Sequence, residues 1–177
     1  MHANTATLEM LIDREAIRDV ITRVARGEDR RHDGLLKTAF WPEAKIDLAV
    51  MQGSFDDYLG WVVPGAEAIK NTLHTLGQSM ISLRGDTAKT ETHVTSYHRV
   101  DTGSEDRDTV IGGRYLDWLE KREGEWRISS RIMLYDWFHD DGVSVDWSQG
   151  VMGMPFLADH YTGRANGDFS GEFFASL

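Results

Sequence analysis

The sequence predicts an α+β fold in which helices cover one face of a curved, mostly antiparallel sheet. Two observations carry this prediction. Apolar residues recur at helical spacing in three segments before residue 78, whereas later segments alternate with the period of two that is typical of strands. The clearest strand pair is a hairpin over 112–131, where two runs rich in aromatic and branched residues flank a charged turn at 121–125.

Three helices are expected in the first part of the chain. Asp13 is a suitable N-cap for a helix that ends near Gly27. Its inward positions are Ile17, Val20, Ile21 and Val24. A second helix is expected over 32–40, and a third over 65–77, which places His74 close to the third helix's C-terminal end.

The strands are expected to follow one another as a meander. A first strand is predicted over 44–51, between the second and third helices. Four more are predicted over 78–83, 89–100, 109–120 and 126–138. Turn compositions separate them, and a double glycine at Gly112-Gly113 indicates a bend in a strand or a close approach between neighbouring strands.

The chain is expected to form one domain over 1–140, with an irregular extension over 141–177. Glycine and small polar residues dominate this extension, yet it contains more aromatic residues than a disordered tail. We expect it to pack on the domain or on a neighbouring subunit. The part around 147–156 is expected to cap a pocket or to contact that neighbour.

Composition excludes several classes of function. The net charge of −10 argues against nucleic-acid binding, and no apolar run approaches the length that crosses a membrane. The chain has no cysteine, no phosphate-binding glycine loop and no His-Glu-x-x-His motif. We therefore expect a cytoplasmic protein that uses no metal and no organic cofactor, and that acts on a small molecule.

Several short segments follow one another in a characteristic order. They are Arg14–Asp19, Asp29-Arg30-Arg31, Phe40–Ala44, His74-x-x-x-Gln78, Ser96-Tyr97-His98 and the 112–131 hairpin. This order resembles the SnoaL-like branch of the nuclear-transport-factor-2-like (NTF2-like) superfamily. The resemblance implies a cone built from a curved sheet with N-terminal helices on its concave side. That branch includes scytalone dehydratase, hexachlorocyclohexane dehydrochlorinase, bile-acid dehydratases, polyketide cyclases and formaldehyde-releasing lyases that act on lignin-derived dimers.

The resemblance also implies a catalytic pair. Asp29 and His74 match the positions where the dehydratases and the dehydrochlorinase carry an Asp–His pair. An imidazole has a pKa near neutrality and can remove a proton, while a carboxylate on its far nitrogen fixes the tautomer. One departure is Gln78, because the family usually has asparagine there.

Two further residues are catalytic candidates. His98 lies on the same predicted strand face as Val94 and Ser96, which alternation places on the concave side. Arg131 matches a pocket arginine of the dehydrochlorinase branch, where it would pair with Asp29 or stabilise developing negative charge. The expected substrate-binding residues are Tyr115, Trp41, Tyr58, Trp61, Val94, Ser96 and Asp47.

These features predict a lyase that eliminates water or formaldehyde from a hydroxylated aromatic compound, such as a lignin-derived diarylpropane diol. A ketosteroid-isomerase-like isomerase, a polyketide cyclase and a non-catalytic ligand-binding module remain alternatives on the same fold. The resemblance also implies a homo-oligomer, with a trimer favoured.

Overall fold

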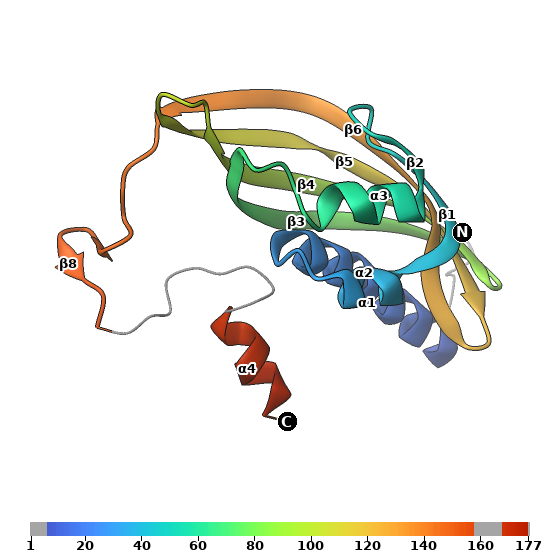
Figure 1. Cartoon of the computed structure of the whole chain (residues 1–177). Helices are drawn as coiled ribbons and strands as arrows, with labels where there is room; N and C mark the ends of the chain where they lie inside the picture. Colours follow the sequence, from blue (N-terminus) through green and yellow to red (C-terminus); the bar gives the residue numbers. More distant parts are fainter. Residues whose placement is uncertain (1–6, 158–167, 177) are drawn as a thin grey trace, which may run out of the picture.

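A six-stranded, open and strongly curved sheet carries the fold, and three helices lie in its concavity (Figure 1). The computed structural model describes residues 7–157 and 168–176. The strand order is β2-β1-β6-β5-β4-β3, in which only the β1–β6 pair is parallel. The strands are β1 Phe40–Asp47, β2 Gln52–Ser54, β3 Ile69–Arg84, β4 Thr87–Asp101, β5 Asp106–Arg122 and β6 Glu125–Val143. The predicted α+β class and the curved sheet are confirmed.

The first helix, α1 (Leu8–Asp29), starts earlier than the sequence suggested. Thr7 is its N-cap and accepts a hydrogen bond from the backbone N of Met10 at 3.2 Å. Asp13 is instead buried inside the helix, where its Oδ1 accepts bonds from Lys121 Nζ and Trp126 Nε1, both at 2.8 Å. The four predicted inward residues of α1 are all buried in the core.

The helix predicted over 65–77 does not exist. Its residues from Ile69 onward belong to β3, which pairs with β4 along nearly its whole length. The helical spacing of a few apolar residues was too short a signal, and sheet pairing outweighed it. The helix of this region is α3 (Phe55–Val62), which Ser54 and Asp57 start with a capping box.

The short helix α2 (Asp33–Ala39) agrees with the prediction over 32–40. The double glycine works as expected. A Cβ on Gly112 would lie 2.0 Å from the Trp137 ring, and one on Gly113 would lie 2.1 Å from the backbone O of Leu134. The pairing of β5 with β6 shifts register at this point, so the glycines permit the close approach that bends the sheet.

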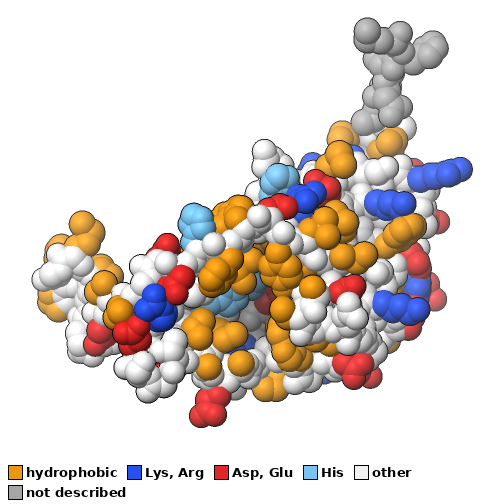
Figure 2. Space-filling view, turned by 90° about the horizontal axis from the view of Figure 1, so that it is seen from above, with side chains coloured by type: hydrophobic (Ala, Val, Ile, Leu, Met, Phe, Trp, Pro, Cys, Tyr) orange, Lys and Arg blue, Asp and Glu red, His pale blue; other side chains and the backbone are white. Residues whose placement is uncertain are grey.

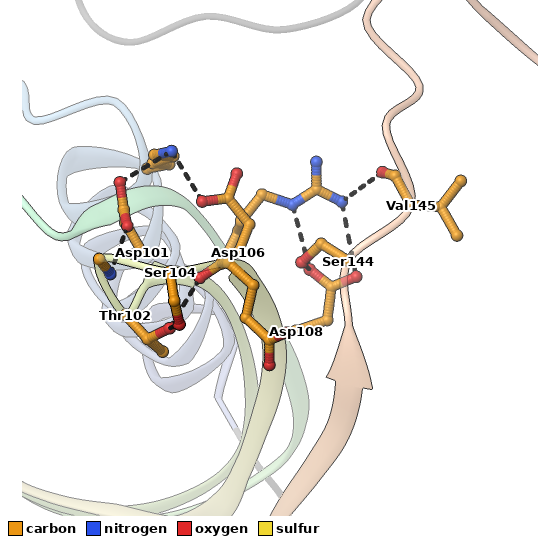
Figure 3. A network of polar contacts seen from close by, with 11 residues as sticks. Asp101, Thr102, Ser104, Asp106, Asp108, Ser144 and Val145 are labelled. Carbon is orange, nitrogen blue, oxygen red and sulfur yellow. Dashed lines mark hydrogen bonds and ion pairs between the residues drawn. The ribbon is translucent and has the colours of Figure 1, made fainter.

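The start of the C-terminal extension is fixed at the sheet edge. β6 continues past the expected boundary at 140, and a polar cluster then holds the chain (Figure 3). In it, Asp108 Oδ1 accepts bonds from Ser144 Oγ and Tyr97 OH, both at 2.6 Å. Arg99 Nη2 donates to the backbone O of Val145 at 3.1 Å.

The rest of the extension reaches two places. A small hairpin of β7 (Gly150–Val151) and β8 (Met154–Pro155) projects away from the sheet, whereas α4 (Phe169–Ala175) returns towards α1 (Figure 1). Arg30 Nε lies 2.9 Å from Asp168 Oδ2, and Arg26 Nη2 donates to Ser170 Oγ at 3.0 Å. Residues 158–167 and 177 of the expected extension lie outside the described residues.

No helix in the described ranges, 7–157 and 168–176, is long and apolar enough to cross a membrane.

The outer face of the sheet leads to a prediction about assembly. Met80, Trp118 and Ile132 are 70%, 49% and 42% exposed on this face in the single chain. Exposed apolar groups of this size are typical of subunit contacts. We expect sedimentation analysis to give a homotrimer, and Trp118→Glu to weaken it while Glu15→Lys, an exposed change on α1 away from this face, leaves it intact. A monomeric wild-type protein would contradict this prediction.

Candidate functional site

A cavity of about 340 Å³ lies between the helices and the concave face of the sheet. Figure 2 shows the hollow, with hydrophobic side chains around it. Its apolar wall includes Trp61, Val62, Ile111, Tyr115, Met133 and Tyr135. Polar groups are few, and they gather where the end of α1 meets β3 and β4. An apolar cavity with a few convergent polar groups is the usual form of a small-molecule site.

Asp29 and His74 form the contact that the resemblance implied, and His74 lines this cavity. Nδ1 of His74 lies 2.7 Å from Asp29 Oδ1, and both side chains are about one-tenth exposed or less. The backbone N of His74 also donates to both carboxylate oxygens, at 3.0 and 3.1 Å. Asp29 therefore fixes the ring from one side, and this orientation leaves Nε2 as the nitrogen available for other chemistry.

The structure adds a second carboxylate that sequence reasoning missed. Glu28 lines the cavity, and its Oε2 lies 3.5 Å from His74 Nε2. Tyr58 OH donates to the other oxygen, Oε1, at 2.5 Å. The imidazole thus lies between two neighbouring acids of α1. A signal was present in the sequence, because two adjacent acids in the last turn of a helix are disfavoured by the helix dipole.

The two carboxylates determine the charge state of the ring. Burial by itself lowers the pKa of His74, but the charges of Glu28 and Asp29 and the bond to Asp29 outweigh it and raise the pKa above the ordinary value of 6.5. Burial, reinforced by the charge of Glu28, raises the pKa of Tyr58 and Tyr115 well above its usual range. Both tyrosines are therefore neutral hydrogen-bonding groups.

Arg131 does not pair with Asp29. It forms a bidentate ion pair with Asp117 on β5, with Nε–Oδ1 and Nη2–Oδ2 distances of 2.7 and 2.8 Å. The pair is almost completely buried, at 1% and 0% exposure. The guanidinium carbon lies 4.0 Å from the centroid of the Tyr115 ring, which stands between it and the cavity wall. Burial lowers the pKa of Arg131, and the charge of Asp117 more than reverses this effect.

The family of this chain follows from a match to a known family model. Residues 9–132 match the family described as SnoaL-like domain. This chain belongs to the SnoaL-like domain family. As a member, it is a small-molecule catalytic or binding protein with the NTF2-like fold.

Solved structures support the SnoaL-like fold at low sequence identity. A LinA type 3 hexachlorocyclohexane dehydrochlorinase from Novosphingobium barchaimii is 19% identical, with a TM-score of 0.67, over 87% of this chain and 100% of that one. A candidate scytalone dehydratase from Novosphingobium aromaticivorans is also 19% identical, with a TM-score of 0.66, over 82% and 97%. Kfla4162 from Kribbella flavida is 20% identical, with a TM-score of 0.65, over 73% and 94%. No curated protein sequence matches the chain.

Four other candidates of this SnoaL-like chain lie at the cavity. His98, Ser96, Tyr115 and Trp61 all contribute to its lining. The His98 ring meets the His74 ring edge-on, with centroids 6.1 Å apart. Tyr58 is completely buried behind the cavity and acts on it through Glu28.

Three candidates are not at the cavity. Trp41 lies on the other side of the sheet, where its indole N donates to the backbone O of Glu120 at 3.2 Å and two arginines cover its ring. Asp47 accepts bonds from Ala49 N and Gln52 Nε2 at 2.9 Å and so fixes the β1–β2 turn. Val94 is buried in the core but does not line the cavity. The sequence analysis predicted this strand over 44–51, whereas β1 begins at Phe40. Trp41 was therefore not assigned to a strand, and its face of the sheet was not predicted.

The described residues contain no group of three or more His, Cys, Asp or Glu side chains arranged to hold a metal ion.

Proposed function

We propose that this SnoaL-like protein is a cofactor-independent lyase that eliminates water or formaldehyde from a hydroxylated aromatic compound. The observation that supports this most is the Asp29–His74 pair, with its 2.7 Å contact, at the wall of an apolar cavity. Such a pair transfers protons at positions that water reaches poorly, which suits an elimination. The aromatic and aliphatic lining favours one or two substrate rings.

In the proposed reaction, Asp29 orients the imidazole and His74 transfers the proton through Nε2. His98 and Tyr115 are placed to hold the substrate's polar groups, because both line the same cavity. Arg131 acts at longer range, since its charge is directed to Asp117 and it does not line the cavity. A lignin-derived diarylpropane diol, which carries two aromatic rings and two hydroxyl groups, is the substrate that we propose to test first.

The test is incubation of the purified protein with a diarylpropane diol, followed by measurement of free formaldehyde and mass spectrometry of the aromatic product. We expect either formaldehyde release or a product that has lost water. Binding without any change in mass would favour a non-catalytic ligand-binding module. A product of unchanged mass but altered spectrum would instead favour an isomerase.

We predict that the activity needs no metal. Dialysis against a chelator is expected to leave the rate of formaldehyde or water loss unchanged, because the proton transfer is assigned to His74 and the carboxylates beside it. The measurement is the rate before and after dialysis, with each of several divalent metals added back. A rate that disappears on dialysis and returns with one metal would refute the prediction.

A further inference from the structure

Glu28 occupies a position that is unfavourable for a structural carboxylate. It lies in the last turn of α1, where the helix dipole disfavours negative charge, and it is only 8% exposed. Within the described part of the chain, its Oε2 is buried and accepts no hydrogen bond. Oε1 accepts a hydrogen bond from the buried Tyr58 hydroxyl, whereas Oε2 lies 3.5 Å from His74 Nε2, so the second oxygen calls for a functional explanation.

The two neighbouring acids face different spaces. Asp29 lines a second hollow on the α1 side, and all its contacts with His74 serve to hold that residue. Glu28 lines the main cavity. Its Oε1 accepts a hydrogen bond from Tyr58, and its Oε2 lies next to His74 Nε2. The cavity therefore contains a carboxylate and an imidazole 3.5 Å apart, and the raised pKa of His74 favours an imidazolium beside a carboxylate.

We propose that Glu28 is a second catalytic residue: it accepts the proton of a substrate hydroxyl while protonated His74 gives a proton to the leaving group. The inference rests on the proposed function and deepens it. It assigns base and acid to two different side chains, with Asp29 as the residue that positions the acid. It also defines the substrate class as neutral hydroxylated compounds.

The step balances for a diol that loses formaldehyde and water. The hydroxymethyl O–H proton moves to Glu28 Oε2, and the oxygen–hydrogen electron pair forms the C=O bond of formaldehyde. The carbon–carbon bond to the hydroxymethyl group breaks, and its electrons form a carbon–carbon double bond. The hydroxyl on the next carbon leaves with the His74 proton as water. Transfer of a proton from Glu28 to His74 Nε2 across their contact then restores both groups.

The charges around the cavity favour a neutral substrate. Glu28 would repel a substrate carboxylate, and the nearby cations are already engaged. Arg131 is paired with Asp117. Arg31 lines the cavity but donates to the backbone O of Ile69, at 2.7 Å, and of Pro64. A hydroxyl group, which donates a hydrogen bond to Oε2, fits this environment.

The first test compares Glu28→Gln with Glu15→Gln, a control on an exposed position of the same helix. Glutamine retains an acceptor for Tyr58 but cannot take a proton. We expect Glu28→Gln to lower kcat for the diarylpropane diol by about 100-fold or more with little change in KM, as for loss of a general base. The control should keep the wild-type rate. If Glu28→Gln keeps the wild-type rate while His74→Ala is inactive, the inference is overturned and the proposed function stands.

The pH profile separates this assignment from one in which His74 is the base. The groups that act on His74 are Glu28 and Asp29 from α1, His98 from β4 and Arg131 from β6. Tyr58 and Tyr115 also lie within the field of Glu28, and both stay neutral. If His74 is the acid, the rate falls as pH rises through its raised pKa. A rate that instead rises through that pKa would overturn the assignment.

A binding measurement, read from the initial change in fluorescence before the diol is consumed, tests the substrate class independently of turnover. The probes are the diarylpropane diol and the same compound with its hydroxymethyl group oxidised to a carboxylate, followed by tryptophan fluorescence. We expect the wild-type protein to bind the diol at least about tenfold more tightly than the carboxylate, a difference of about 1.4 kcal/mol. Glu28→Gln should remove this preference. If the wild-type protein and Glu28→Gln prefer the diol over the carboxylate to the same degree, the inference is overturned, even if neither compound is turned over.

Discussion

His74→Ala is expected to abolish turnover of the diarylpropane diol while the protein remains folded. The ring is the group through which the proposed proton transfer passes, and general acid–base groups contribute about 10²–10⁴-fold to rates. Asp29→Asn should have a smaller effect, because it removes an orienting charge and leaves the ring in place. The measurement is kcat for the purified variants, with their circular dichroism as the check on folding.

His74→Gln controls for the loss of packing, since its amide still donates towards Asp29. It also tests the charge state of the wild-type ring. Because the pKa of His74 is raised in the folded protein, the protonated ring stabilises the fold. This contribution is complete below a pH of about 6.5 and is lost as pH rises through the folded pKa. His74→Gln should lack that part of the pH dependence. Unchanged kcat in either His74 variant would end the proposed mechanism.

The sequence predicted the Asp29–His74 contact although it wrongly placed His74 in a helix. The prediction of the contact rested on residue types at positions that match the family, so it does not depend on whether His74 lies in a helix or a strand. The strand was missed because Ile69, Leu73 and Leu76 happen to recur at helical spacing. Their strand conformation depends on β4, whose pairing with β3 cannot be read from that segment alone.

Glu28 and Arg131 show what sequence reasoning misses for physical reasons. Glu28 stood beside the expected catalytic acid, but its orientation depends on where Tyr58 of α3 lies, and α3 was not predicted. The orientation of the Arg131 side chain depends on a single register shift between β5 and β6. The hairpin pairs Leu119 with Ile128 but Trp118 with Ser130, so one strand carries an extra residue at this point. That bulge places Asp117 opposite Arg131, whereas a regular hairpin would turn the arginine to the outer face.

Arg131→Met is expected to have the largest effect on stability of any single change near the site. It would leave Asp117 as a buried charge without its partner, and breaking a buried ion pair costs about 3–5 kcal/mol. The measurement is the free energy of unfolding from urea denaturation. Arg122→Met, at a 41% exposed side chain that pairs with Glu120 and Glu43, is the control for an exposed arginine and should cost about 1 kcal/mol or less.

The double variant Arg131→Met with Asp117→Leu separates a lost attraction from a stranded charge. Buried pairs are expensive to desolvate, so replacing both members with apolar residues should recover most of the stability that Arg131→Met loses. In Arg131→Met, which keeps Asp117, loss of the positive charge that acts on His74 should raise the pKa of His74 further and move the pH profile of the activity upward. The double variant removes both charges of the pair and should show a smaller shift. An Arg131→Met variant no less stable than Arg122→Met would show that the pair does not hold the sheet at this bulge.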